Sequence, residues 1–364
     1  MDKIKLALYG AGMVGVSVCE AIKTLYENCE ITAFLVTEKE GNPSTIFGIP
    51  VISLNEFNGK HVKILIATPE NHHDVIAAEL ERRNLTDYIC IDSEKEAILM
   101  ERYYYAIHKF PSLHVCPPGN VKASMEVYMT RFHKDKPLKK PYTPPPWVRP
   151  IQAGAALTDE RITELRDDSG DNISDKNGNY SELTALYWVG RHGGHLQDAG
   201  TLLHPYSAGN LYLGLFHYRR VLDIGEEDLY RIEGNDIDVV LPFPTVHFPA
   251  IDEHHRRYVR EQDWEAMVQA LRELAPEYER SMSCIFSRPY FYNFNMFIAK
   301  EHIFRDYCDW LFPILQRTEE LSTPRGWERR DRYVGYLGEN LTTLYFMYHQ
   351  NNFRIAHTGR LMLI

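Results

Sequence analysis

Three glycines near the start of the chain restrict its fold more than any other feature of the sequence. The apolar run over residues 3–9 is typical of a buried strand, and residues 16–26 have the spacing of a helix. Gly10, Gly12 and Gly15 lie between these segments in the spacing G-x-G-x-x-G. Glycines at these positions permit a tight turn from strand to helix and let a phosphate approach the helix N-terminus. The motif therefore predicts an α/β nucleotide-binding unit.

The alternation of strands and helices continues after this motif. Strand character recurs at residues 31–36, 62–67 and 88–91, and residues 73–84 have the spacing of a helix. We therefore predict a small doubly wound Rossmann-like domain over residues 1–112. Glu38, just after the second strand, is the candidate for the acidic side chain that holds the ribose of NAD.

This first segment resembles the small nucleotide-binding domains that are fused to bacterial sugar-modifying enzymes, such as sugar-nucleotide acetyltransferases and polysaccharide-biosynthesis epimerases. Domains of that kind bind NAD, CoA or a nucleotide sugar, or serve only as scaffolds. The resemblance implies two alternatives for residues 1–112: a bound NAD or other nucleotide, or a scaffold without a ligand.

Composition and charge restrict the class of protein further. The net charge of −10 argues against a general nucleic-acid-binding role. Six cysteines without a C-x-x-C pair fit reduced thiols better than disulfides or a zinc site. The sequence contains no recognisable signal peptide and no apolar run long enough to span a bilayer. We therefore expect a cytoplasmic protein.

A linker and a second domain are expected after residue 112. Residues 113–122 carry prolines and a glycine without any helical or strand period, which predicts the linker. Residues 123–364 then form the second domain. Within it, residues 139–146 are basic and rich in proline. This loop is either solvated, or a flap that contacts acidic lipid headgroups, so peripheral association with the inner membrane face is one expectation.

An apolar strand in the second domain ends abruptly on charged residues. Residues 211–216 have strand composition, and His217, Tyr218, Arg219 and Arg220 follow directly. In open α/β sheets, ligands bind at the carboxyl ends of the strands, and guanidinium groups match the geometry of phosphate. We interpret this cluster as a diphosphate-binding site. The alternative is a pair of surface arginines just past a buried strand.

Other polar side chains follow predicted strands or precede a helix predicted over residues 180–188. A loop dense in carboxylates and amides before that helix can present hydrogen-bond partners to a nucleotide sugar, or can be only a capped turn. The candidates for donor binding, at strand ends, in this loop or on a later aromatic run, are His133, Gln152, Asp168, Asp171, Asn172, Asn179, Glu182, His217, Tyr218 and Asn295. His192, His195 and His204 lack regular ligand spacing, so we interpret them as structural or surface histidines and predict no metal site.

A set of short segments in the second domain carries a more specific signal. They are residues 151–155, 168–174, 179–188, 214–220, 238–242, 253–255, 292–298 and 332–341. In this order they resemble a bacterial glycosyltransferase family of capsule and lipopolysaccharide O-antigen clusters. That family includes galactofuranosyltransferases and was long described as a domain of unknown function. The resemblance spans about residues 123–355, and it implies a GT-A-like fold. The segment over residues 190–210 departs from the family, in which a shorter connection is expected at this place.

The resemblance implies transfer of a hexose, with galactofuranose as one expectation, from a UDP-sugar to a lipid-linked glycan. Many GT-A enzymes hold a divalent metal with an Asp-x-Asp motif, and residues 217–219 occupy that place here without a carboxylate. We therefore hypothesise that Arg219 and Arg220 replace the metal in stabilising the leaving diphosphate. A metal held by Asp168 or Asp171 is the competing hypothesis.

The family analogy further implies an inverting reaction, which needs a base to deprotonate the acceptor hydroxyl. Glu339 is the first candidate, because it lies in a matching segment, and Asp171 and Glu182 are alternatives. His254 and His255 lie in another matching segment and are the candidates for acceptor binding.

Two other function classes stay open from the sequence. The glycine motif would also suit an NAD(P)-dependent oxidoreductase or epimerase that acts on a sugar nucleotide. A non-catalytic nucleotide-sugar sensor or assembly subunit is the third class, and transfer or hydrolysis of a UDP-sugar would separate it from an enzyme. The sequence leaves the sugar, the linkage and the oligomeric state open.

Overall fold

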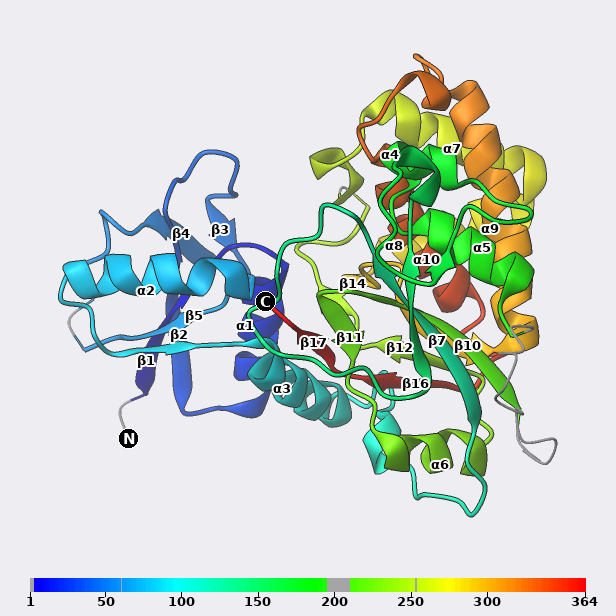
Figure 1. The fold of residues 1–364 in the computed structure, drawn as a ribbon. Helices are drawn as coiled ribbons and strands as arrows, with labels where there is room; N and C mark the ends of the chain where they lie inside the picture. The colour runs from blue at the N-terminus through cyan, green and yellow to red at the C-terminus, as the bar shows by residue number, and fades with distance from the viewer. Residues whose placement is uncertain (1–2, 60, 195–209, 253) are drawn as a thin grey trace.

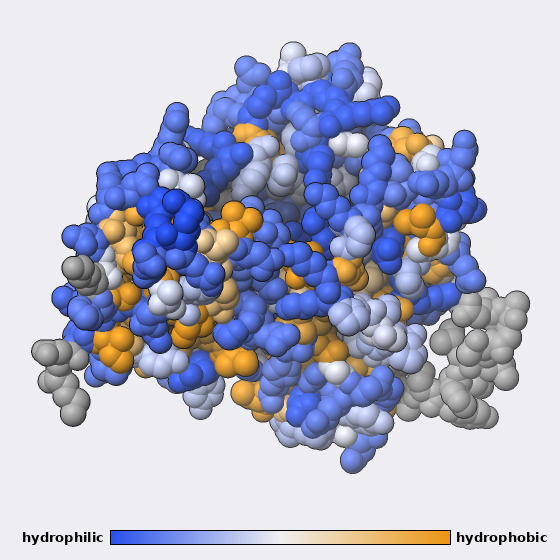
Figure 2. Space-filling view, turned by 60° about the vertical axis from the view of Figure 1, so that its left-hand side comes forward, coloured by the Kyte–Doolittle hydropathy of each residue, from blue (hydrophilic) through white to orange (hydrophobic). Residues whose placement is uncertain are grey.

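The computed structural model describes residues 3–59, 61–194, 210–252 and 254–364. The chain forms two helix-covered sheets that lie side by side (Figure 1). Hydrophilic residues cover most of the face seen in Figure 2, and hydrophobic residues form only small groups among them. The mixed α/β fold class predicted from the sequence is confirmed.

The first sheet is built from the N-terminal part of the chain. Its strands, in spatial order, are β3 (Thr45–Ile46), β4 (Ile49–Ser53), β2 (Cys29–Val36), β1 (Ile4–Tyr9), β5 (Lys63–Ile66) and β6 (Tyr88–Cys90). All neighbours are parallel except β3 and β4. The helices are α1 (Met13–Leu25), α2 (His73–Arg82) and α3 (Ser93–Ala106), with a short 3₁₀ turn η1 (Glu70–His72).

Both faces of this sheet are buried, as a parallel sheet requires. Leu6 and Leu8 of β1 belong to the core that contains α1 and α3. The alternate residues Ala7 and Tyr9 belong to a second core with Ile76 of α2. Helices on opposite faces of a parallel sheet are the doubly wound arrangement.

The second sheet carries the rest of the chain. Its order is β16 (Ile355–Thr358), β12 (Val239–Pro242), β15 (Phe297–Lys300), β10 (Leu211–His217), β7 (Ser124–Arg131), β8 (Val148–Gln152) and β9 (Leu165–Arg166). Strands β10, β7, β8 and β9 are parallel, and β15 is antiparallel to both of its neighbours. Two short strands, β11 (Arg220–Leu222) and β17 (Arg360–Met362), extend the end of β10.

Helices cover both faces of the second sheet. One face packs against α5 (Leu183–His192), α7 (Glu261–Leu274), α8 (Pro276–Phe286), α9 (Glu301–Leu321) and α10 (Tyr333–Tyr348). The other face packs against α6 (Glu226–Gly234) and the turn η2 (Leu113–Val115). The remaining short elements are α4 (Asn177–Tyr180), β13 (Thr245–Val246), β14 (Tyr290–Phe291), η3 (Ala155–Leu157), η4 (Ser174–Lys176), η5 (His254–Arg257) and η6 (Gly326–Glu328).

Strand β10 lies at the centre of the second sheet. Leu213 and Leu215 pack on the face with five helices, whereas Tyr212 and Phe216 pack on the α6 face. Gly214 lets β15 approach closely, since a Cβ atom there would lie 3.0 Å from the Phe297 carbonyl oxygen. This continuous burial explains why residues 211–216 have strand composition without a polar face.

The helix predicted over residues 180–188 is interrupted. Tyr180 ends α4, Ser181 has a positive φ of 51°, and α5 begins only at Leu183. The side-chain amide of Asn177 donates to the Ser181 carbonyl oxygen at 2.7 Å and so stabilises the break. The prediction missed this break because local helical spacing continues across it. Within the described residues, no helix combines the length and the apolar character needed to cross a membrane.

Candidate functional site

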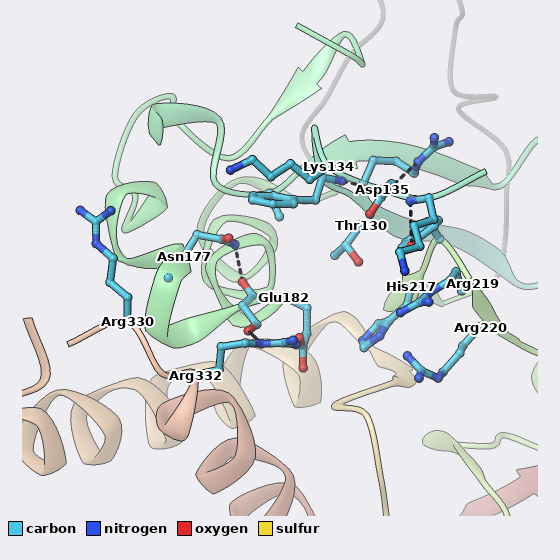
Figure 3. A pocket seen from close by; sticks show the side chains of 17 residues that line it. Thr130, Lys134, Asp135, Asn177, Glu182, His217, Arg219, Arg220, Arg330 and Arg332 are labelled. Carbon is cyan, nitrogen blue, oxygen red and sulfur yellow. Dashed lines mark hydrogen bonds and ion pairs between the residues drawn. The ribbon is translucent and has the colours of Figure 1, made fainter. Parts of the chain in front are cut away.

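A cavity of about 550 Å³ opens at the carboxyl ends of β7 and β10. Thr130 and His217 are direct partners in these parallel strands, so both strands end at the same edge. Figure 3 shows the arrangement: His217, Arg219 and Arg220 lie on one side of the cavity, and Arg330 and Arg332 lie on the other. The cavity therefore occupies the place where open α/β sheets bind ligands.

A tight hairpin brings the two adjacent arginines to the cavity. His217 pairs with Arg220 across β10 and β11, which leaves Tyr218 and Arg219 as the turn. The backbone N–H of Tyr218 donates to the Thr130 carbonyl oxygen at 3.1 Å. The turn is thus fastened to the end of the neighbouring strand.

Positive charge predominates among the described residues that line the cavity. Seven of them are cationic and two are carboxylates: Arg131, Lys134, Lys136, Arg219, Arg220, Arg330 and Arg332, against Asp135 and Glu182. The whole chain, in contrast, has a formal net charge of −10. A local excess of cations in an acidic protein favours an anionic ligand with several charges.

Several buried polar atoms at this edge have no hydrogen-bond partner within the described part of the chain. They are the Nε atoms of Arg219 and Arg220 and the Nε2 atom of His217. A buried polar group without a partner costs about 1–3 kcal/mol. These atoms are therefore suited to bind a ligand that enters the cavity.

The protonation states of His217 and Arg220 follow from burial. Burial lowers the pKa of His217 to about 4, so the ring is neutral near pH 7. Burial and the nearby guanidinium of Arg360 lower the pKa of Arg220 to about 10, which still leaves it charged. Its guanidinium carbon lies 4.2 Å from the centroid of the Phe294 ring.

Two glutamates lie next to this cationic cluster. Glu182 precedes α5 and lines the cavity, and its Oε1 accepts a 2.7 Å hydrogen bond from the Asn295 side chain. Glu339 of α10 is half-buried and is not one of the lining residues. Burial and the charge of Glu182 raise the pKa of Glu339 to about 8, although a backbone hydrogen bond from Phe294 and the charge of Arg220 oppose this. The negative charge of Glu182 therefore favours the protonated form of Glu339.

The arginines on the far side of the cavity were not predicted as site residues from the sequence. Arg332 has a positive φ of 64° at the start of α10, and its Nε donates to the Ser181 hydroxyl at 2.8 Å. Arg330 is exposed and also lines the cavity. The run of charged residues over 329–332 was the available signal, but similar runs are common on protein surfaces.

The structure brings five of the predicted site residues to the cavity, namely Glu182, His217, Tyr218, Arg219 and Arg220. Others stabilise nearby backbone. Gln152 is fully buried and bonds to the backbone of Glu160 and Ile162, at 2.8 and 3.1 Å. The side chain of Gln152 therefore stabilises a loop and does not line the cavity.

The carboxylates and amides of residues 167–180 also have partners away from the cavity. Asp168 forms an ion pair with Arg166 at 3.2 Å, and Asp171 accepts from the Tyr187 hydroxyl at 3.0 Å. Asn172 bonds to its own turn, and Asn179 donates to the Gly326 carbonyl oxygen at 2.6 Å. Asn295, which was expected to contact the donor, is fully buried against Glu182 and the Gly335 carbonyl oxygen.

Two other candidate histidines, His133 and His255, do not line the cavity. His133 is half-buried and its ring lies 4.2 Å from that of Phe132. His255 is buried with its ring stacked at 3.9 Å on Trp264, and His254 lies in η5.

The remaining histidines, His192, His195 and His204, were considered above as possible metal ligands. His192 ends α5 and does not lie in a loop as expected, whereas His195 and His204 lie outside the described residues. Within the described ranges, no group of three or more His, Cys, Asp or Glu side chains is arranged to hold a metal ion.

The glycine motif lies far from this cavity, in the first sheet. Gly12 lines a separate cavity of about 190 Å³. Glu38 is exposed and lies two residues beyond the end of β2. The structure therefore places the expected nucleotide site and the arginine cluster at different sheets.

Comparisons with known proteins agree on the second part of the chain. A family model described as "Domain of unknown function (DUF4422)" matches residues 127–351, and this range contains every described residue that lines the arginine-rich cavity. A solved apo structure of WbbM, titled a bifunctional glycosyltransferase, is similar with 27% sequence identity and a TM-score of 0.53. The similarity covers 66% of this chain but only 45% of the other. No curated protein matches the sequence.

Proposed function

We propose that this chain, which belongs to the DUF4422 family, is a glycosyltransferase that moves a hexose from a nucleotide-sugar donor to a glycan acceptor. The observation that carries the proposal is that Arg219 Nε, Arg220 Nε and His217 Nε2, at a strand-end cavity, have no hydrogen-bond partner among the described residues. The similar WbbM structure, a bifunctional glycosyltransferase by title, supports the same class of activity.

The donor's diphosphate is the part of the substrate that the cavity suits best. A diphosphate carries several negative charges and offers oxygens to planar guanidinium groups in pairs. Arg219 and Arg220 supply such groups from one side, and Arg332 supplies another from the opposite side. In the proposed reaction these cations stabilise the charge that develops on the leaving diphosphate, the task that a divalent metal performs in many GT-A enzymes.

Glu182 and Glu339 are proposed to supply the base for an inverting reaction. The acceptor oxygen forms a bond to the anomeric carbon as the bond to the diphosphate breaks, and its proton passes to a carboxylate. Glu182 lines the cavity, whereas Glu339 has a pKa of about 8 and is coupled to Glu182. A carboxylate with the pKa of Glu339 is matched to accept a proton near neutral pH.

The finer assignment of donor and acceptor rests on the family resemblance. A UDP-hexose, with galactofuranose as the first sugar to test, is the proposed donor. A lipid-linked glycan of a capsule or lipopolysaccharide is the proposed acceptor, which would place the enzyme at the inner membrane face.

The test is calorimetric titration of UDP and UDP-sugars into the wild type and into Arg219→Ala and Arg220→Ala, first with EDTA and then with manganese. We expect binding in EDTA and a loss of about tenfold or more in affinity in each variant, because charge-assisted hydrogen bonds contribute roughly 1.5–3 kcal/mol. Arg280→Ala, at an exposed position in α8, is the matched control and should bind like the wild type.

Two outcomes would contradict this proposal. Binding that requires manganese would show that the arginines do not replace a metal. Equal binding by the wild type and both cavity variants would place the donor elsewhere in the molecule.

A further inference from the structure

The carboxyl edge of the first sheet, where an open α/β sheet normally binds its ligand, contacts the second half of the same chain. At the end of β1, the Ser17 hydroxyl of α1 accepts a 2.9 Å hydrogen bond from the backbone N–H of Val246. At the end of β6, the Ser93 hydroxyl of α3 accepts a 2.8 Å hydrogen bond from the N–H of Met362 in β17. Figure 1 shows β17 beside α3.

The end of β5 makes the third contact. Glu70 of η1 forms an ion pair with Lys140 at 3.2 Å, and Asp74 of α2 forms one with Lys139 at 2.9 Å. These lysines belong to the proline-rich loop that was expected to be solvated or to contact lipid. Lys134 and Lys136, which line the arginine-rich cavity, come shortly before this loop in the sequence. Contacts at the ends of three neighbouring strands therefore fasten the second half to this edge.

Packing alone accounts for two of the three motif glycines. A Cβ atom on Gly10 would lie 2.4 Å from the Ala67 carbonyl oxygen, and one on Gly15 would lie 1.9 Å from the Gly10 carbonyl oxygen. Only Gly12 faces open space, and residues 247–250 lie across the cavity that it lines. That cavity is about 190 Å³, below the roughly 300–1,000 Å³ of ordinary ligand pockets. Arg257 also lines this cavity, but the volume is too small for a dinucleotide while residues 247–250 lie there.

A chain of contacts leads from this edge to the arginine-rich cavity. Glu96 of α3 pairs with Arg360 of β17 at 3.4 Å, and their side chains are only 13% and 11% exposed. The Arg360 guanidinium carbon lies 4.9 Å from the centroid of the Phe294 ring, which Arg220 also contacts. Strand β17 pairs with β11, where Met362 is the partner of Arg220. The carboxylate of Glu96 thus holds one guanidinium in place beside another of like charge.

We propose that the carboxyl edge of the first sheet is a docking surface for the second half of the chain, and that Glu96 is a positioning residue that orients Arg220 through Arg360. The second part rests on the proposed function, because it takes Arg220 as a ligand of the donor diphosphate. In this proposal the N-terminal segment supports the structure of the donor site and does not bind a nucleotide of its own.

The first experiment compares Glu96→Gln with Glu94→Gln, an exposed glutamate in the same first turn of α3. Affinities for UDP and for uridine are measured, together with amide hydrogen exchange of residues 220–222 and 360–362. In Glu96→Gln we expect faster exchange in both strands and a loss of about fivefold in UDP affinity, with uridine affinity unchanged. Glu94→Gln should match the wild type in every measurement.

Equal exchange and equal UDP affinity in the two variants would overturn the positioning role, and a parallel loss of uridine affinity would show general damage to the site. If the wild type binds no UDP, the proposed function fails, but the exchange data still test the docking.

A second experiment titrates NAD, NADP and CoA into the wild type and Gly12→Ser. Serine is a preferred residue at a helix N-cap, so this variant keeps α1 intact while its side chain blocks a phosphate. No binding to either protein is expected. Saturable binding by the wild type that is lost in Gly12→Ser would overturn the docking surface.

Discussion

Glu182 raises the pKa of Glu339, which burial has already raised, so that the carboxyl group of Glu339 titrates at about 8. The two residues come from segments far apart in the sequence, one before α5 and the other within α10. The positive charges of Arg220 and Arg332 oppose this shift. Glu339 therefore interacts electrostatically with two of the arginines that are proposed to bind the diphosphate. The proposed base and the proposed ligands of the diphosphate would therefore act in one site.

The rate of transfer should depend on the protonation of Glu339. A base with a pKa of about 8 is mostly protonated below that pH, so kcat/KM should rise with pH and level off above about 8. Glu339→Gln should lower the rate by about a hundredfold or more and remove the rise. Rate profiles of the wild type, Glu339→Gln and Glu182→Gln check this. An unchanged profile in Glu339→Gln would indicate that Glu182, and not Glu339, is the base.

The free energy of unfolding should also depend on the raised pKa of Glu339. The pKa of Glu339 is raised from 4.5 to about 8, so between these pH values the folded protein keeps a proton that the unfolded chain has released. The free energy of unfolding therefore decreases as the pH rises through this window. Glu339→Gln lacks the titrating group and should gain on the order of 2 kcal/mol relative to the wild type between about pH 5 and pH 8. Urea unfolding at both pH values measures this difference, and parallel changes in the two proteins would contradict it.

Asn295 should matter through Glu182 and not through the donor. Asn295→Asp replaces the amide that donates to Glu182 by a carboxylate of similar shape in a fully buried position. We expect a loss of about 2–3 kcal/mol in stability and of about tenfold or more in rate. Thermal unfolding and transfer assays check both, with Asn172→Asp as the control in a surface turn. A variant with normal stability and only weaker UDP binding would indicate a direct donor contact instead.

The carboxylates of the loop over residues 167–180 should be dispensable for donor binding. Asp168 and Asp171 are engaged with Arg166 and Tyr187, and neither lines the arginine-rich cavity. Asp168→Asn and Asp171→Asn should therefore bind UDP within about twofold of the wild type, with or without manganese. A loss of manganese-dependent binding in either variant would favour a metal site in this loop.

The three glycines of the first sheet should differ sharply in their tolerance of a side chain. Gly15→Ala places a Cβ atom 1.9 Å from the Gly10 carbonyl oxygen, whereas a Cβ atom on Gly12 meets nothing within 4 Å. We expect Gly15→Ala to lower the free energy of unfolding by about 3 kcal/mol or more, and Gly12→Ser to change it by less than about 0.5 kcal/mol. Chemical unfolding of both variants decides the matter. Equal stability would mean that α1 does not pack as closely on β1 as described.

Local patterns in the sequence were enough for the fold class and for the two most informative turns. Buried parallel strands need continuous apolar runs, and the close passage from β1 to α1 needs glycine, so both features are visible without any knowledge of distant partners. The apolar run of β10 and the arginines after it were recognisable for the same reason. Neighbouring parallel strands end at one edge, so residues at a strand end could be expected near a ligand.

Tertiary structure alone decided which polar residues face the cavity. Gln152, Asp168 and Asn179 occur in the same kind of sequence context as Glu182, but their side chains bond to Glu160, Arg166 and Gly326 and do not line the cavity. Arg332 reaches the cavity because a positive φ at the start of α10 directs it toward Ser181, across a large sequence separation.

The edge of the first sheet illustrates the same limit. Its glycine motif is typical of a nucleotide site, yet whether a ligand or the chain's own residues 246–250 and 360–362 occupy that edge depends on contacts between segments more than two hundred residues apart. Local propensity and periodicity determine which segments become strands, helices and turns. The pairing of distant segments determines which buried polar groups are satisfied internally and which remain to bind a ligand.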